Sequence, residues 1–452
     1  MFRKYPILLL LVPLVVLILF ADRWHWDDFS GMPKTLDEGK RQYVAVVQDY
    51  AKQCPKTWRV EAEVMPERTH AYLYLQSDST RTLPTLGDTI LIMAQFKQGG
   101  QLGDFDYGRY LLRNGIGGTA YVGKKDWKIT GYAMTTPLPL LPQKVQHKAY
   151  ERYKQMGISG QELATTAALT LGYKDDLDQE LKGSFQKAGA AHIFAVSGLH
   201  TGIIYSILFF LFTCFGLYPP LYEARNHQRV VSGLIIIALI GYSLLTGGTP
   251  SVVRSVIFVS MVELAKIWHR QPFLMNTLLV TAFVILFFRP LDLFSVSFQL
   301  SFAAVAGIIL LEPKIRSLFP LPLKTDTIGF KTVNYFRTLL TISLAAQIFT
   351  LPLSLYYFSQ TSNLFFVTNM IVIPLAFLLM VCALLLLILG WVPIAGEVLA
   401  TLTSKTAELM NHSVGWVEQL PHAVTYAQMS LPAMVALYMI IFLFVILIRI
   451  VL

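Results

Sequence analysis

Charged residues are scarce in this chain. Only 14% of its 452 residues are Asp, Glu, Lys or Arg, whereas soluble domains carry about a quarter. The hydrophobic set makes up 54% of the chain, and the mean hydropathy is positive. This balance excludes a single soluble enzyme, a disordered chain, a collagen-like fibre and an outer-membrane β-barrel, and it predicts a membrane protein.

Cysteine is also rare, with three residues in the whole chain. Cys214 and Cys382 lie in apolar runs, and only Cys54 lies in a polar region. A disulfide framework within the polar region is therefore excluded.

The charges that are present divide the chain in two. Residues 21–188 hold 22 Lys or Arg and 20 Asp or Glu, whereas residues 189–452 hold 13 and 8. A polar domain therefore precedes a membrane domain. Of the net charge of +9, +5 (13 minus 8) falls in the membrane half, where basic residues mainly set topology.

Apolar runs predict the membrane spans. Residues 1–21 predict an anchor, because Arg3 and Lys4 precede an apolar run that lacks the cleavage pattern of a signal peptide. Further runs lie at 189–218, 230–246, 251–268, 273–288, 292–311, 338–358, 364–390 and 431–452, with a weaker amphipathic stretch at 396–420. We expect a polytopic α-helical membrane domain over 189–452 and about nine spans in all. The basic residues place the amino terminus inside and the polar domain outside.

The polar domain shows two patterns. Alternation with period 2 predicts strands at Trp58–Val64, His70–Gln76 and Asp88–Ala94, and hence a soluble β domain over 35–135. Helical spacing with dense charge predicts amphipathic or surface helices over 136–188, and solvated linker helices fit this pattern as well.

The most informative segment is Ala188-Gly-Ala-Ala-His-Ile-Phe-Ala-Val-Ser-Gly-Leu-His-Thr-Gly. It resembles the signature His-Leu-Leu-Ala-Val-Ser-Gly-Leu-His-Val-Gly of the ComEC competence family. Further blocks that resemble this family occur in the same order: Gly103-Asp-Phe-Asp-Tyr-Gly-Arg-Tyr-Leu-Leu, Thr249-Pro-Ser-Val-Val-Arg-Ser, Ser297-Phe-Gln-Leu-Ser-Phe, and Asn363-Leu with Asn369 through Pro374. The resemblance covers most of residues 35–450.

The resemblance implies a channel-like protein that moves single-stranded DNA across the cytoplasmic (inner) membrane during natural transformation. It implies an OB-like β domain on the periplasmic or extracellular side. The implied partners are single-stranded DNA, the lipid bilayer, a separate DNA receptor and, in a homo-oligomer, further copies of the chain. No Gly-x-x-x-x-Gly-Lys-Ser/Thr loop occurs, so a cytoplasmic motor or another driving force would have to pull the strand.

Many family members continue into a metallo-β-lactamase-like domain credited with degrading the strand that is not transported. This chain ends at Leu452, and its nine His residues form no His-x-His-x-Asp-His cluster. That cluster supplies ligands at the spacing that a metallohydrolase needs. We therefore expect a short form of the family that is not an enzyme, with no catalytic residue, metal or cofactor. Any nuclease is then another polypeptide or absent.

Polar side chains within the apolar runs are candidates for a DNA path. They are His192, Ser197, His200, Arg254, Asp292, Gln299, Gln347 and Asn369. Arg254 is the most informative candidate, because placing an isolated cation at the bilayer centre costs about 3 kcal/mol or more. It should face a cavity, or it has a structural role, either by pairing with Asp292, Glu263 or a helix C-terminus or by lying near enough to the interface to snorkel, and both alternatives stay open.

Two readings compete for Ser197 and His200, which share one helical face at spacing i, i+3. They suggest an intramembrane hydrolase, but Ala195-Val-Ser-Gly-Leu lacks the first Gly of a Gly-x-Ser-x-Gly elbow. The alternative is structural: Ser197 allows close helix packing, and His200 lines a pore or caps a helix. A transporter of another polyanion or small solute is a further rival function.

The amides Gln299, Gln347 and Asn369 can line a path or join helices by hydrogen bonds of about 1 kcal/mol each. Gly247-Gly-Thr-Pro and Pro374 predict helix breaks, which often border transport sites, and ordinary helix kinks are the default alternative.

The β domain offers aromatic and basic side chains for stacking and phosphate contact. The candidates are Trp58, Arg59, Tyr72, Tyr74, Lys97, Arg109 and Arg113. Aromatic residues on alternating strands are usually core, and a net charge of +2 (22 minus 20) over 21–188 leaves only a faint electrostatic footprint.

Overall fold

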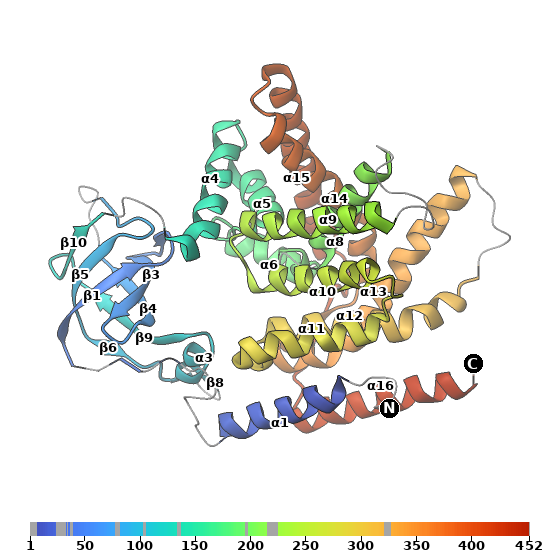
Figure 1. The fold of residues 1–452 in the computed structure, drawn as a ribbon, viewed down its shortest axis with the longest axis horizontal. Helices are drawn as coiled ribbons and strands as arrows, with labels where there is room; N and C mark the ends of the chain where they lie inside the picture. The colour runs from blue at the N-terminus through green and yellow to red at the C-terminus, as the bar shows by residue number, and fades with distance from the viewer. Residues whose placement is uncertain are drawn as a thin grey trace. The chain divides into compact units, whose positions relative to one another are not determined.

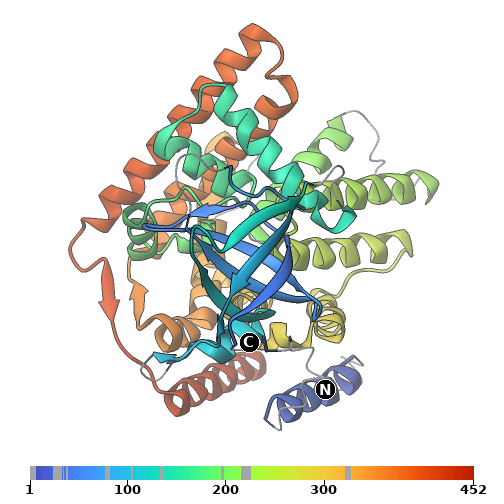
Figure 2. The same ribbon diagram turned by 90° about the vertical axis from the view of Figure 1, so that its left-hand side faces the viewer.

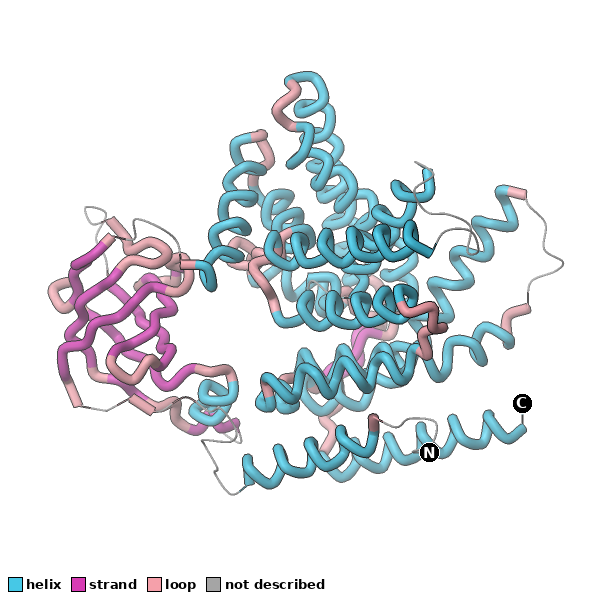
Figure 3. Tube along the Cα trace, in the orientation of Figure 1, coloured by secondary structure: helices cyan, strands magenta, loops and turns pink. Residues whose placement is uncertain are grey.

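The computed structural model describes residues 7–23, 33, 35–36, 39–76, 82–102, 105–132, 137–194, 198–214, 225–320 and 327–451. The chain forms two compact units, Met1–Val145 with Ala282–Ser295, and Gln146–Thr281 with Val296–Leu452. Strands are concentrated in the first unit, and the second is almost entirely helical (Figure 3).

A mixed sheet forms the β domain of the first unit (Figure 1). Its strands are β1 (Arg41–Val47), β2 (Lys52–Gln53), β3 (Trp58–Met65), β4 (Thr69–Leu75), β5 (Thr89–Ala94), β6 (Phe96–Lys97), β9 (Ile116–Val122) and β10 (Trp127–Gly131). Their order is β10-β5-β1-β3-β4-β9-β6, and β2 also pairs with β3. The β4–β9 pair is parallel, and the other pairs are antiparallel. Because β5 borders β1 and the adjoining β6 borders β9, the sheet curls into a half-barrel.

Alternation of side chains builds the core of this sheet. In β3 and β4 every second residue is buried, so Val60, Ala62, Leu73 and Leu75 face inward and are 0% exposed. Residues of opposite parity face outward, as the pleat of a strand requires. The three strands predicted from period 2 are confirmed as β3, β4 and β5.

The rest of the first unit consists of short elements. These are α1 (Leu8–Arg23), β7 (Gln101–Leu102), β8 (Phe105–Asp106), α3 (Tyr107–Arg113), η1 (Leu138–Leu140) and η2 (Pro290–Phe294). The carboxylate of Asp106 accepts a hydrogen bond of 2.9 Å from the backbone N–H of Arg109, which caps the start of α3. The α3 helix packs against β9.

The helices of the second unit lie over most of the predicted apolar runs, while the predicted number of about nine spans stays a prediction. They are α4 (Leu141–Gln155), α5 (Gly160–Thr170), α6 (Gln179–Lys187), α7 (Ala191–Phe194), α8 (Gly198–Cys214), α9 (Arg225–Leu245), α10 (Pro250–Ile267), α12 (Val296–Ser317), α13 (Ile328–Phe358), α14 (Phe365–Leu389), α15 (Pro393–Glu418) and α16 (Leu431–Val451), while α11 (Leu274–Phe288) crosses into the first unit. Among the residues that the structure describes, four helices are long and apolar enough to cross a membrane, in α9, α12, α13 and α14, and shorter apolar helices lie in α1, α8, α11 and α16. The chain is a polytopic α-helical membrane protein with an N-terminal β domain.

One predicted helix break is confirmed and one is wrong. Gly247 and Gly248 have φ of +69° and +65° and end α9, and Pro250 begins α10. Pro374 instead lies inside the continuous helix α14. Proline is tolerated within membrane helices because neighbouring groups satisfy the freed carbonyl, so its presence in the sequence does not by itself predict a break.

From Gln146 on, the segment predicted to form surface or linker helices belongs to the second unit. In α5, every residue from Leu163 to Thr170 is buried, and this helix contacts α14 and α15. Apolar side chains of α5, α6, α7, α14 and α15 form one core cluster. A second cluster joins α8, α9 and α10 with Met380 of α14, and a third joins α12, α13 and α16.

The directions of the helices differ within this unit. α9 and α10 run side by side, and α15 lies steeply across their direction in both views (Figures 1 and 2). A short ladder between β11 (Gln360–Ser362) and β12 (Val424–Tyr426) joins the segment before α14 to the segment after α15.

Candidate functional site

The outer face of β2, β3, β4, β9 and β6 carries two rows of side chains. Residues that pair across strands share a face of the sheet. The first row is Lys52, Arg59, Tyr74 and Tyr121, and the second is Glu61, Tyr72, Thr119 and Lys97. We call these eight residues the tyrosine face.

Arg59 and Tyr72 lie in contact on this face. The Arg59 guanidinium carbon lies 5.2 Å from the centre of the Tyr72 ring, which is the geometry of a cation–π contact. Burial raises the pKa of Tyr72 to about 12, so its hydroxyl remains a neutral hydrogen-bond donor at physiological pH. The pair offers both a ring for stacking and a cation beside it.

The structure places four of the seven β-domain candidates on the tyrosine face and the other three elsewhere. It brings Arg59, Tyr72, Tyr74 and Lys97 together on one face. Trp58 has the inward parity of β3, Arg109 belongs to α3, and the Arg113 guanidinium lies 4.1 Å from the ring centre of Phe294.

Tyr121 is the aromatic residue of this face that sequence reasoning missed. It is 58% exposed, and its hydroxyl accepts a hydrogen bond of 3.1 Å from the side-chain amide of Gln76. Alternation in Ile116-Gly-Gly-Thr-Ala-Tyr-Val is the signal that would have revealed it, although two glycines weaken that pattern.

Two glutamates lie at this part of the sheet: Glu61 on the tyrosine face, and Glu63 two residues further along β3. Nδ1 of His70 lies 3.2 Å from Oε1 of Glu61, and the Gln48 amide donates to Glu63 at 3.2 Å. The hydrogen bond to Glu61, and to a smaller degree the charges of Glu61 and Glu63, raise the pKa of His70, while burial opposes them.

Arg254 joins two helices of the membrane domain. It is 4% exposed, and its guanidinium donates to the backbone carbonyl of Ser297 at 3.1 Å and to the Ser297 hydroxyl at 2.6 Å. The partner that the structure gives it is thus the start of α12, which the sequence did not suggest. Asp292 pairs with Arg289 at 3.7 Å within η2.

The intramembrane amides also make hydrogen bonds to neighbouring elements. Gln299 accepts from the Tyr357 hydroxyl at 2.9 Å, and Gln347 donates to the Thr361 hydroxyl at 3.1 Å. Asn369 donates to the Ser343 hydroxyl at 3.1 Å, joining α14 to α13. Each predicted amide therefore links segments that are distant in sequence.

The two histidines of the signature segment differ in exposure. His192, in α7, is exposed, and its Nδ1 lies 3.2 Å from the carbonyl oxygen of Gly189, while His200, near the start of α8, is 0% exposed. Ser197 lies outside the described residues, so its predicted shared face with His200 stays a prediction.

A buried carboxylate connects α8, α9 and α10. Glu263 is 0% exposed and accepts hydrogen bonds from Tyr205 at 2.8 Å, from Ser232 at 2.7 Å and from Lys266 at 2.6 Å. The Lys266 ammonium also donates to the Tyr205 hydroxyl at 2.8 Å. Sequence reasoning named Glu263 only as a partner for Arg254, because hydropathy does not reveal which polar groups meet.

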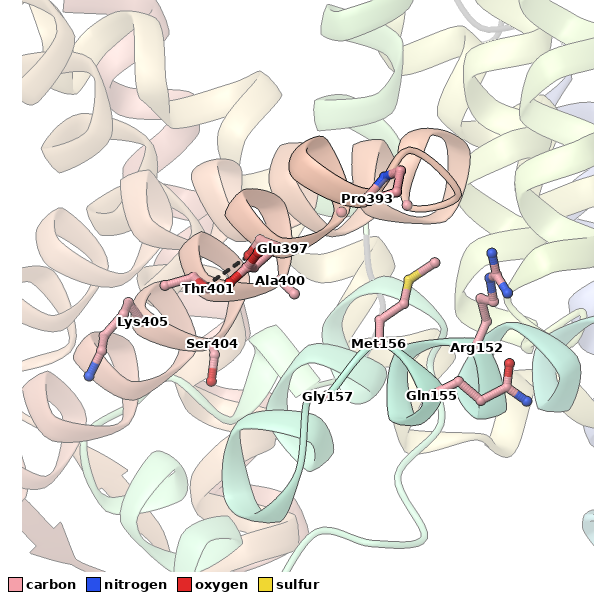
Figure 4. A pocket seen from close by; sticks show the side chains of 12 residues that line it. Arg152, Gln155, Met156, Gly157, Pro393, Glu397, Ala400, Thr401, Ser404 and Lys405 are labelled. Carbon is pink, nitrogen blue, oxygen red and sulfur yellow. Dashed lines mark hydrogen bonds between the residues drawn. The ribbon is translucent and has the colours of Figure 1, made fainter.

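A cavity of about 710 Å³ lies between the end of α4 and the face of α15 (Figure 4). Its lining residues are Arg152, Gln155, Met156, Gly157, Gly390, Pro393, Gly396, Glu397, Ala400, Thr401, Ser404 and Lys405. None of the residues predicted for the DNA path lines it.

Comparison with known proteins places this chain among competence proteins. Residues 169–451 match the model of the family described as "Competence protein". The ComE operon protein 3 of Bacillus subtilis is 30% identical over 207 residues, which are 46% of this chain and 24% of that protein. Recombination protein 2 of Haemophilus influenzae is 30% identical over 217 residues, which are 47% of this chain and 27% of that protein.

A third relative is uncharacterized protein YcaI of Escherichia coli, with 24% identity over 212 residues, which are 47% of this chain and 27% of that protein. The matched part of the chain thus spans 24% to 27% of the length of these relatives. No solved structure matches the chain.

Proposed function

This chain belongs to the competence protein family, and from that premise we propose that it carries single-stranded DNA across the cytoplasmic membrane during natural transformation. In this proposal the β domain lies on the outer side and receives the strand, and the helices of the second unit form the conduit. The chain makes or breaks no covalent bond. A separate receptor delivers the DNA, a cytoplasmic motor pulls the strand, and a separate nuclease degrades its complement.

The observation that carries the proposal is the tyrosine face. In this proposal, β3 and β4 take the place of the second and third strands of an OB-like barrel, the strands whose face binds oligonucleotides in that fold. Tyr72, Tyr74 and Tyr121 offer adjacent rings, and Arg59 and Lys97 offer cations. Stacking of a base on an aromatic side chain contributes about 1–3 kcal/mol and tolerates any base, as a conduit for arbitrary sequence requires.

The membrane domain supports the proposal through polar side chains that join its helices. Arg254, Gln299 and Gln347 link α10, α12, α13 and β11 by hydrogen bonds. A strand can pass along these residues only if the helices part and their bonds are exchanged for bonds to phosphates, bases or water. The conduit is therefore proposed to open along the contacts between α10, α12 and α13.

The test combines a cellular and a biochemical measurement. Deletion of the gene should abolish transformation by added DNA, and expression of the intact chain should restore it. The purified full-length protein should bind a fluorescent oligodeoxynucleotide, with an affinity that falls steeply as salt rises because phosphate contacts release counterions. Normal transformation in the deletion strain would reject the proposal.

The rival functions give different results in the same experiments. A transporter of another polyanion or of a small solute predicts unchanged transformation together with loss of uptake of that solute. An intramembrane hydrolase that uses Ser197 and His200 predicts that Ser197→Ala abolishes activity without unfolding the protein. A packing role for Ser197 predicts that alanine is tolerated.

A further inference from the structure

The cavity between α4 and α15 lies at the end of a predicted membrane span. Gly390, which lines it, directly follows the last residue of α14, one of the four described helices long enough to cross a membrane, and Pro393, also in the lining, begins α15. Trp391, between them, is 72% exposed. Because tryptophan is enriched at membrane–water interfaces, this is the position expected for a site at the depth of lipid headgroups.

Side chains of both charges line this cavity without partners. Arg152, Gln155 and Glu397 are exposed and Ser404 is half-buried, and within the described ranges the side chains of these four residues make no hydrogen bond or ion pair. Lys405 is instead paired with Glu408 at 2.8 Å, so its charge is already matched. The cavity therefore offers one unmatched cation, one unmatched carboxylate and two neutral polar groups.

We propose that this cavity binds the headgroup of a phospholipid that carries a primary amine. The Arg152 guanidinium, with the Gln155 amide beside it on α4, binds the phosphate, because guanidinium and phosphate form charge-assisted hydrogen bonds. Glu397, on α15, accepts hydrogen bonds from the ammonium group. A headgroup without an amine leaves Glu397 unmatched, and a quaternary ammonium has no N–H to donate to it.

An apolar surface for the acyl chains adjoins the cavity. Ile394, Val398 and Leu402 recur every four residues along α15 and are 79%, 53% and 48% exposed. This spacing places them on one side of the helix, next to the cavity-lining side that bears Glu397 and Thr401. A phospholipid can contact both the polar cavity and the adjoining apolar surface, whereas a free phosphate or a soluble phosphoamine contacts only the polar cavity.

The test uses detergent-purified full-length protein and native mass spectrometry. Phosphatidylethanolamine should remain bound under conditions that remove phosphatidylglycerol and phosphatidylcholine of the same acyl composition. Arg152→Ala and Glu397→Gln should each weaken phosphatidylethanolamine binding by about tenfold, the loss expected for one charged hydrogen bond. Lys154→Ala removes an exposed cation from the same helix without touching the cavity and should leave binding unchanged.

Three results would overturn the proposal. Equal retention of the three lipids would show that the site does not select an amine. Loss of binding in Lys154→Ala equal to that in Arg152→Ala would show that the effect is one of surface charge. Equal competition by water-soluble phosphoethanolamine would show that the ligand is a soluble phosphoamine. None of these results depends on DNA transport.

Discussion

The guanidinium of Arg254 in α10 bonds to both the hydroxyl and the backbone carbonyl of Ser297 in α12. A buried cation is thus held by the first turn of another helix. This pairing explains how an arginine can lie within an apolar helix, since its charge meets oriented oxygen dipoles. A mutation of Arg254 should therefore weaken the contact between α10 and α12.

Replacement of Arg254 by alanine should loosen this contact. We expect Arg254→Ala to lower the free energy of unfolding by about 1–3 kcal/mol, because the Ser297 groups lose a charged donor. Arg254→Lys should retain part of the stability, because an ammonium can still donate. Unfolding of the purified protein in detergent measures the difference, and wild-type stability in Arg254→Ala would show that the bonds contribute nothing.

Replacement of Glu263 should be more severe. Removing one partner of a buried ion pair costs about 3–5 kcal/mol, and we expect the lower end because the Lys266 side chain is 23% exposed. Glu263→Ala combined with Lys266→Met should be less destabilising than the sum of the two single changes. The exposed Glu180→Ala in α6 is the matched control. Additive effects in this cycle would contradict the pairing.

The tyrosine face should bind single-stranded DNA through its rings. We expect Tyr72→Ala with Tyr74→Ala to weaken oligodeoxynucleotide binding at least about tenfold, and Tyr72→Phe with Tyr74→Phe to preserve most of it, because stacking needs only the ring. Tyr132→Ala, which removes an exposed ring that follows β10, is the control. Fluorescence anisotropy measures the affinity, and equal losses in the alanine and phenylalanine pairs would argue against stacking.

The stability of the β domain should depend on pH through His70. Its pKa in the folded state is raised above 6.5, so protonation favours the folded state. The contribution is complete below pH 6.5 and is lost as the pH rises through the raised pKa. The bond is partly exposed, so the effect is small, within about 1 kcal/mol.

Thermal unfolding of the full-length wild type and of His70→Gln tests this dependence. The wild type should be the more stable of the two below pH 6.5, and the difference should vanish above the raised pKa. A difference that grows with rising pH would have the wrong sign for a bond between protonated His70 and Glu61.

Local pattern in the sequence was sufficient for much of the fold. The alternation in Trp58–Val64 determined β3 and its inward residues, because the side chains of a strand alternate between its faces. The apolar runs determined the membrane helices, because a span must satisfy its backbone within itself and present apolar side chains to lipid. The motif at 188–202 indicated the family, which the family match over 169–451 confirms.

Tertiary structure alone decided which distant residues meet. Tyr121 lies beside Tyr74 through a parallel pairing between strands far apart in the chain, and Glu263 meets Tyr205 and Ser232 where three helices pack. The sequence alone could not show that Pro374 leaves α14 continuous, because the effect of a proline depends on whether neighbouring groups satisfy the freed carbonyl. Strand register and helix packing are set by the sum of many weak contacts along the whole chain, so no single segment contains them.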